Sequence, residues 1–161
     1  MKRYLLLLAL GTCIGFTSCS KDDDKKPADP QTNTPQKPEA SAKTKMLSAK
    51  PWKLESLTNN GQDMMNNPLF PNCNKDDLYK FNTDSTITVN DGVILCPSNP
   101  SNGTWEFKNN ETIINLTIPS ISLVATGDFT LESLSETTLV LSKVQTIAGT
   151  NSTFVATFKA Q

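Results

Sequence analysis

The stretch that decides the fold is Gly103-Thr104-Trp105-Glu106-Phe107-Lys108, followed by the segment Asn109-Asn110-Glu111 and by Thr112-Ile113-Ile114-Asn115-Leu116. Trp105 and Phe107 alternate with charged residues, and this period of two places apolar side chains on one face of a strand. The Asn-Asn-Glu segment is typical of a tight turn. The stretch therefore predicts a β-hairpin with one buried face.

Similar alternation continues in both directions from this hairpin. We predict eight strands: Trp52–Thr58, Asp77–Asn82, Ser85–Asn90, Gly103–Lys108, Thr112–Pro119, Leu123–Leu131, Thr138–Val144 and Thr153–Lys159. Clusters of Asn, Asp, Ser, Gly and Pro separate them, and no segment shows convincing helical periodicity. One apolar face per strand and hairpin-length links predict an all-β domain, an eight-stranded antiparallel up-and-down barrel.

The N-terminus resembles a lipoprotein signal peptide. Lys2 and Arg3 precede a short apolar run, and Phe16-Thr17-Ser18-Cys19 resembles the lipobox before which lipoprotein signal peptidase cuts. We expect residues 1–18 to be removed and Cys19 to carry acyl chains such as palmitate. Leu10-Gly11-Thr12-Cys13 is the alternative site, and it leaves a shorter apolar run.

The segment after Cys19 is polar. Ser20-Lys21-Asp22-Asp23-Asp24 resembles the export signal of some outer-membrane lipoproteins, which implies a lipid-anchored protein facing the cell surface. A solvated charge cluster is the alternative interpretation. Residues 25–45 hold four Pro and almost nothing apolar, so we expect 19–45 to be a disordered tether and 46–161 to be the folded domain.

Composition excludes several classes of function. The chain has no His, and its one Arg is Arg3. Residues 46–161 hold seven Lys and eleven Asp or Glu, a net charge of −4, which disfavours nucleic-acid binding. Because nothing resembles Ser-x-x-Lys or Gly-x-Ser-x-Gly, we expect no enzyme and no cofactor. We also expect no metal site, since Asp76 and Asp77 would point to opposite faces of a strand and Asn90-Asp91-Gly92 is too short for a calcium loop.

Residues 46–161 resemble the lipocalin-like domains of bacterial surface lipoproteins. The resemblance rests on an ordered set of motifs: Lys50-Pro51-Trp52-Lys53-Leu54, Cys73, Asp76-Asp77-Leu78-Tyr79-Lys80-Phe81, Cys96-Pro97, Gly103-Thr104-Trp105-Glu106-Phe107, and the strands ending Leu139-Val140-Leu141 and Phe154-Val155-Ala156-Thr157-Phe158. It implies an eight-stranded barrel and a lipid anchor. Lys50 stands where true lipocalins have Gly, and no Arg exists to stack on Trp52.

Cys73 and Cys96 are the two cysteines of the predicted domain. An even pair in an exported protein favours a disulfide. A redox pair and a metal thiolate site are the alternatives, but the spacing is not Cys-x-x-Cys and no His is present to complete a metal site.

The long loop Asn59–Lys75 is the best functional candidate, because loops of this length are commonly lids or binding loops. It is predicted to be either a lid over the mouth of the barrel or a plug that fills its end. The candidate ligand-binding residues are apolar or aromatic and come from this loop and from inward strand positions: Met64, Met65, Phe70, Tyr79, Phe81, Trp105, Phe107 and Phe129.

Two functions remain open from the sequence. One is a non-enzymatic binding module for a small apolar molecule, a glycan or a protein. The other is a structural or assembly lipoprotein with a filled barrel and no ligand. In addition, Asp84-Ser85-Thr86 resembles a bacterial O-glycosylation acceptor with Ser85 as the modified residue, although an Asp in a tight turn is the simpler explanation.

Overall fold

The computed structural model describes residues 39–97, 101–118 and 126–161. The chain divides into Met1–Lys37 and a compact unit of its own, Pro38–Gln161. The elements of this unit are α1 (Ala42–Ala49), β1 (Trp52–Asn59), β2 (Gln62–Asp63), the 3-10 helix η1 (Asn72–Lys75), β3 (Leu78–Phe81), β4 (Thr86–Asn90), β5 (Ser101–Lys108), β6 (Ile113–Thr117), β7 (Gly127–Leu134), β8 (Thr138–Ile147) and β9 (Thr150–Ala160). Among the described residues, no helix is long and apolar enough to cross a bilayer.

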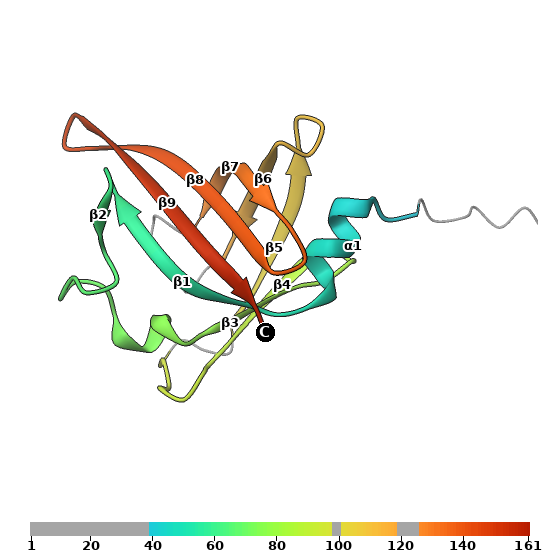
Figure 1. Cartoon of the computed structure of the whole chain (residues 1–161), viewed down its shortest axis with the longest axis horizontal. Coiled ribbons are helices and arrows are strands. Elements are labelled where there is room, and N and C mark those ends of the chain that lie inside the picture. Colours follow the sequence, from blue (N-terminus) through green and yellow to red (C-terminus); the bar gives the residue numbers. More distant parts are fainter. Residues whose placement is uncertain (1–38, 98–100, 119–125) are drawn as a thin grey trace, which may run out of the picture. The chain divides into compact units, whose positions relative to one another are not determined.

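The strands form one antiparallel sheet that closes on itself. Each strand from β3 to β8 pairs with the next in sequence, and β1 pairs with both β3 and β9. The two-residue strand β2 only extends β1 as a short hairpin through the turn Asn60-Gly61. The predicted eight-stranded antiparallel barrel is therefore confirmed (Figure 1).

The inward faces follow the alternation in the sequence. In the hairpin that decided the fold, Trp105 pairs with Leu116 and Phe107 pairs with Ile114. Residues directly opposite in an antiparallel pair point to the same face, so these side chains share the interior. Asn109, Asn110 and Glu111 all adopt positive φ in the intervening turn, where Asn tolerates the left-handed region better than most residues.

Two strands extend further than their sequence patterns predict. β8 and β9 are paired as far as Ile147 and Thr150, because Ala148 and Gly149 make a two-residue turn with φ of 49° and 82°. The predicted strands end at Val144 and begin again at Thr153, so each observed strand is three residues longer toward the turn. The start of the sixth predicted strand, Leu123–Ala125, lies outside the described residues. The described part of that strand is β7, which carries a register shift between Leu131 and Ser133.

The expectation that no helix is present is wrong. α1 begins after Ser41, whose side chain accepts a hydrogen bond from Thr44 N at 3.0 Å, and it includes the last four residues of the predicted tether. An eight-residue helix has little stability of its own, and only Leu47 on it is fully buried, so the sequence shows no apolar stripe. Tertiary contacts hold the helix in place.

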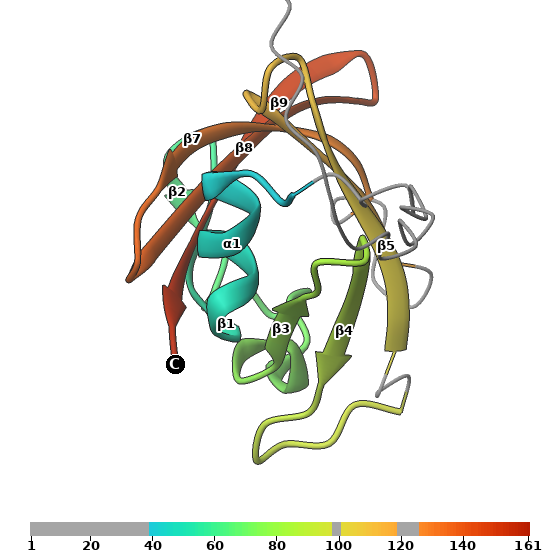
Figure 2. The same cartoon turned by 90° about the vertical axis from the view of Figure 1, so that its right-hand side faces the viewer.

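These contacts close one end of the barrel. Leu47 is 0% exposed, and its carbonyl accepts a hydrogen bond from Trp52 Nε1 at 2.8 Å. Lys80 Nζ donates to Ser48 O, and Lys43 Nζ donates to Glu111 O in the β5–β6 turn. Figure 2, viewed from this side, shows α1 lying across the end of the barrel.

We predict that Leu47→Ala lowers the free energy of unfolding by about 2–4 kcal/mol, because it deletes a fully buried side chain and leaves a cavity. Lys45→Ala, on the exposed face of the same helix, is the matched control and is expected to change stability by less than about 0.5 kcal/mol. Urea unfolding followed by circular dichroism measures both. Equal stabilities of the two variants would contradict the packing of α1 on the barrel.

Candidate ligand-binding site

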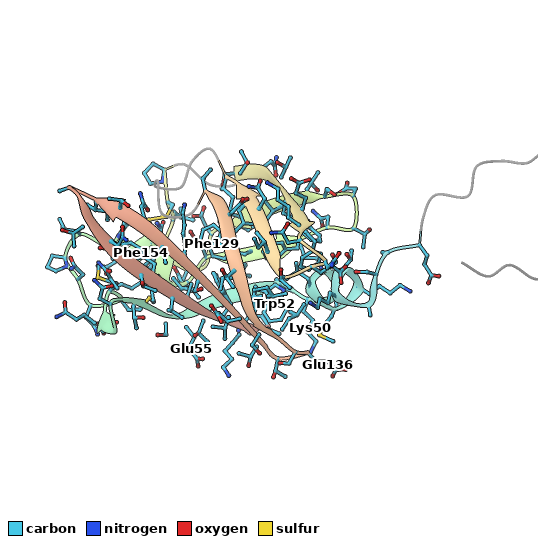
Figure 3. The ribbon with its side chains drawn as sticks, turned by 90° about the horizontal axis from the view of Figure 1, so that it is seen from above. Lys50, Trp52, Glu55, Phe129, Glu136 and Phe154 are labelled. Carbon is cyan, nitrogen blue, oxygen red and sulfur yellow. A yellow bond between two sulfur atoms is a disulfide. The ribbon has the colours of Figure 1, made fainter. Side chains whose placement is uncertain are left out.

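The two ends of the barrel are built differently. α1 covers one end, whereas the other end is bordered by the segment between β2 and β3, which contains η1, and by the loop that follows β4 (Figure 1). In Figure 3, Trp52 lies on the α1 side and Phe129 and Phe154 lie farther from the helix. The interior is therefore closed by a helix at one end and bordered by loops at the other.

A cavity of about 690 Å³ occupies the interior toward the loop end. This volume falls in the range of roughly 300–1,000 Å³ that is usual for small-molecule sites. The described residues that line it come from strand faces and from the two bordering loops: Leu54, Leu57, Met64, Leu69, Phe70, Pro71, Cys73, Asn74, Tyr79, Phe81, Ile87, Cys96, Pro97, Leu116, Ile118, Phe129, Leu141, Phe154, Ala156 and Phe158.

The wall is uncharged. No Lys, Arg, Asp or Glu occurs among the described lining residues, and the side chains of Asn74 and Tyr79 are the polar ones. An apolar wall of this kind favours the transfer of apolar groups out of water, by about 25 cal/mol per Å² buried. The cavity is suited to a neutral molecule that is mainly hydrocarbon.

The hydroxyl of Tyr79 is one of the two polar side-chain groups among the described lining residues. Its ring packs edge-on against Phe158 with centroids 5.5 Å apart. Burial raises the pKa of the Tyr79 hydroxyl above its ordinary value, and the nearby Asp77 carboxylate raises it further. The phenol therefore stays protonated at neutral pH and can donate or accept a hydrogen bond.

Comparison with known proteins identifies the family. The model of the lipocalin-like domain matches residues 49–141, which is more than half of the chain. The chain belongs to the lipocalin-like domain family. No curated protein matches it. Among solved structures, the complex of bovine odorant binding protein with a selenium-containing odorant is 18% identical, with 78% of this chain and 77% of that chain covered and a TM-score of 0.41.

The lipocalin-like barrel brings together five of the eight residues proposed from the sequence. Met64, Phe70, Tyr79, Phe81 and Phe129 line the cavity. The segment that carries Met64 and Phe70 also contributes Leu69 and Pro71 to the wall. The long loop is thus part of the border of the cavity.

Three proposed residues do not line the cavity. Met65 is half-buried and is not among the lining residues, and its backbone N–H donates to Asp63 Oδ1 at 2.8 Å. Trp105 and Phe107 point inward but sit toward α1, where Trp105 packs edge-on against both Phe81 and Phe107 at 5.5 and 5.4 Å. Trp105 Nε1 donates to Asn82 O at 3.0 Å, so its polar atom is satisfied within the core. Strand alternation identifies the face of these side chains but not their height along the barrel axis.

Several lining residues were missed as site residues. Leu57, Phe154, Ala156 and Phe158 meet across β1 and β9, where Leu57 pairs with Ala156 and Asn59 pairs with Phe154. The period-two pattern of the last strand placed its three residues on one face, which was the available signal. Their position beside the cavity depends on the pairing of the first and last strands, which local sequence does not reveal.

The predicted disulfide is confirmed. Cys73 in η1 is bonded to Cys96, with the two Cα atoms 5.3 Å apart. The bond links the two loops that border the cavity. With both sulfurs in the bond, neither is a thiolate that could bind a metal.

Asp77, Asp91 and Cys96 place their ligand atoms within 4.8 Å of one another in the described part of the chain. The Cys96 sulfur is bonded to Cys73 and supplies no thiolate. Asp91 Oδ1 accepts a hydrogen bond from Cys96 N at 2.7 Å. Two carboxylates are too few donors for a structural zinc or calcium site, so we assign the cluster to the architecture of the loops.

Ser85 lies exposed in the β3–β4 turn with φ of 70°. Asp84 Oδ1 accepts hydrogen bonds from Thr86 N at 3.0 Å and from Thr86 Oγ1 at 2.6 Å, which is the geometry of an Asp that stabilises a tight turn. O-glycosylation of Ser85 stays a prediction. Cys13, Cys19 and the charged segment 20–24 lie outside the described residues.

We predict that the double variant Cys73→Ser/Cys96→Ser lowers the free energy of unfolding by about 3 kcal/mol, because the bond closes a loop of 23 residues in the unfolded chain. The β-rich circular dichroism spectrum should persist, since the barrel pairing does not depend on the bond. Urea unfolding with and without reductant provides the measurement. An unchanged midpoint, or free thiols in protein recovered from the cell envelope, would contradict this role.

Proposed function

We propose that this protein is a lipid-anchored, non-enzymatic binding protein of the outer membrane, facing the cell surface, which holds one small, neutral apolar molecule inside its barrel. The observation that carries the proposal is the cavity of about 690 Å³ with an uncharged wall. Membership of the lipocalin-like family supports it.

The chemistry of the wall supports binding rather than catalysis. The described lining residues include no Ser, Thr or Lys nucleophile and no carboxylate base. Covalent catalysis needs a nucleophile beside a base, and the chain has no His to serve. Bound ligand would be held mainly by apolar contact, with Tyr79 and Asn74 available to a single polar group.

The alternative is a structural lipoprotein whose barrel is filled by its own side chains. Eight strands leave room either for packed side chains or for one small ligand. Packing is dense on the α1 side, where Leu47, Trp52 and Trp105 are buried, but a void remains toward the loops. The atoms that line an empty cavity lack van der Waals partners on one side. A ligand that fills the cavity would supply these contacts and stabilise the fold.

Anchoring through Cys19 is the second part of the proposal. The segment between Cys19 and the first described residue, Glu39, is about 20 residues long and rich in Pro. At about 3 Å per residue it would reach roughly 60 Å when extended. Such a tether would let the barrel work at a distance from the membrane that holds it.

We predict that a neutral dye such as N-phenyl-naphthylamine binds saturably, with one site per chain, to a protein that begins at Ser20. Ala156→Phe should weaken binding at least about tenfold, because Ala156 lines the cavity and a phenyl ring would fill it. Fluorescence titration measures the dissociation constant of each variant.

Val155→Phe is the matched control for this experiment. Val155 neighbours Ala156 on β9, pairs with Ser142 and Thr58, and is not among the lining residues. It is expected to bind the dye within about twofold of the parent. Equal losses in both variants, or dye uptake by the parent that never saturates, would refute the ligand-binding function.

We predict that Cys19→Ala releases the protein from the membrane fraction or leaves an uncut precursor. Several acyl chains contribute about 0.8 kcal/mol for each buried CH₂, so their removal should abolish stable anchoring. Fractionation with metabolic labelling by an acyl-chain analogue measures this. If Cys19→Ala is still acylated, the lipid is attached at Cys13 or at another site, which would contradict the prediction.

A further inference from the structure

Four large apolar side chains project into solvent beside the mouth of the cavity. Leu69, in the segment before η1, is 89% exposed, and three consecutive residues after β4, Val93, Ile94 and Leu95, are 94%, 48% and 77% exposed. We name these four residues the apolar rim. Leu69 lies four residues before Cys73 and Leu95 lies directly before Cys96, so the disulfide joins the two loops that carry the rim. Exposure of consecutive large apolar residues is unusual, because soluble proteins generally place them inside.

The backbone of the rim is held by two carboxylates. Asp76 Oδ2 accepts hydrogen bonds from Val93 N at 2.6 Å and from Ile94 N at 3.0 Å. Asp91 Oδ1 accepts from Cys96 N at 2.7 Å. Three backbone N–H groups of this exposed loop are thus bonded by carboxylates of the protein. In an ordinary surface loop such groups can donate to water instead.

Close packing and a covalent bond fix the same loop at its base. A Cβ added at Gly92 would lie 2.3 Å from Asp76 O, so only Gly allows this approach of the two segments. Cys96 is bonded to Cys73, which anchors the other side of the loop. Val93, Ile94 and Leu95 are therefore exposed on a loop whose backbone is held in place by contacts with the segment before β3.

These features are the ones that a protein loop needs in order to enter the apolar interior of a lipid layer. A loop that enters lipid must expose apolar side chains, carry no charge at its tip and leave few backbone groups unpaired. From Gly92 to Pro97 the sequence holds no charged residue, and the carboxylates of Asp76 and Asp91 are turned onto backbone N–H groups.

The size of the rim fits a lipid surface better than a protein partner. Four side chains present roughly a few hundred Å² of apolar surface, whereas a stable protein interface buries about 800 Å² on each partner. Insertion into lipid needs no shape complementarity and rewards each buried side chain separately.

We infer that the apolar rim inserts into a lipid surface and sets the open end of the barrel against it. The two loops that carry the rim, between β2 and β3 and after β4, lie toward the opposite end of the barrel from α1 (Figure 1). This surface contact goes beyond the proposed function, because it requires no ligand in the cavity. If both hold, an apolar ligand would pass between lipid and cavity without crossing bulk water.

The test uses a protein that begins at Ser20, which lacks the lipidation site and contains the whole of the compact unit Pro38–Gln161. It is mixed with vesicles of phosphatidylcholine, or of phosphatidylethanolamine and phosphatidylglycerol, and sedimented. The parent should partition onto both kinds of vesicle. Val93→Ser/Leu95→Ser should reduce the partition coefficient by about tenfold or more, since two exposed side chains no longer transfer favourably.

Val144→Ser is the matched control, because Val144 is 63% exposed and lies on β8, in neither of the two loops that carry the rim. It should change the partition coefficient by less than about twofold. A loss equal to that of the rim variant would indicate general adsorption and overturn the proposal. Failure of the parent to bind either vesicle would overturn it as well, as would a rim-dependent dimer in sedimentation velocity without vesicle binding.

A second measurement guards against misfolding of the serine variant. Ile94→Trp places an indole at the rim, whereas Trp52 and Trp105 are 1% and 4% exposed and report little on lipid. Its emission should shift to the blue on vesicles and be quenched by brominated acyl chains. An unshifted and unquenched emission in the presence of vesicles would contradict insertion.

Dye titration in the absence of vesicles separates this inference from the proposed function. Val93→Ser/Leu95→Ser should bind the dye within about twofold of the parent, because neither residue is among those that line the cavity. If the parent binds dye but not vesicles, the insertion of the rim into lipid is refuted and the proposed ligand site is not. A parent that binds vesicles but not dye would refute the ligand site alone.

Discussion

The pairing of β1 with β9 joins the first strand of the barrel to the last, from Trp52 opposite Ala160 to Asn59 opposite Phe154. Without this ladder, both strands would be sheet edges with unpaired backbone groups. With it, the alternating faces of eight strands enclose a single interior. Every later feature, including the buried core, the helix across one end and the cavity, depends on that enclosure.

Closure creates an interior with two ends, and the two ends are filled by different side chains. Near α1, bulky aromatic residues and Leu47 pack against one another, and the indole N–H groups of Trp52 and Trp105 donate to nearby carbonyls. Toward the loops, the lining side chains, which include the small Ala156 beside Leu57, leave a cavity of about 690 Å³. A difference in packing between the two ends, rather than a special residue, produces the cavity.

Sequence reasoning predicted the strands, the barrel and the disulfide, because period-two alternation and an even cysteine pair are local signals. It missed α1, since that helix buries only Leu47 and is held by contacts from distant segments. It placed Trp105 and Phe107 in the ligand site because alternation reveals the face of a side chain but not its height in the barrel. The rim was missed because Val93-Ile94-Leu95 is too short a run to show that it projects outward rather than packs inside.

The central claim is that the barrel is hollow at one end and open to an apolar molecule. Native mass spectrometry of the protein purified from its own cells without detergent, followed by incubation of the stripped protein with a medium-chain alcohol, tests it directly. The account predicts a one-to-one complex, either with a molecule retained from the cell or with the added alcohol, that dissociates when the chain is unfolded. A bare chain mass under both conditions would contradict a hollow barrel and would leave the outer surface as the basis of function.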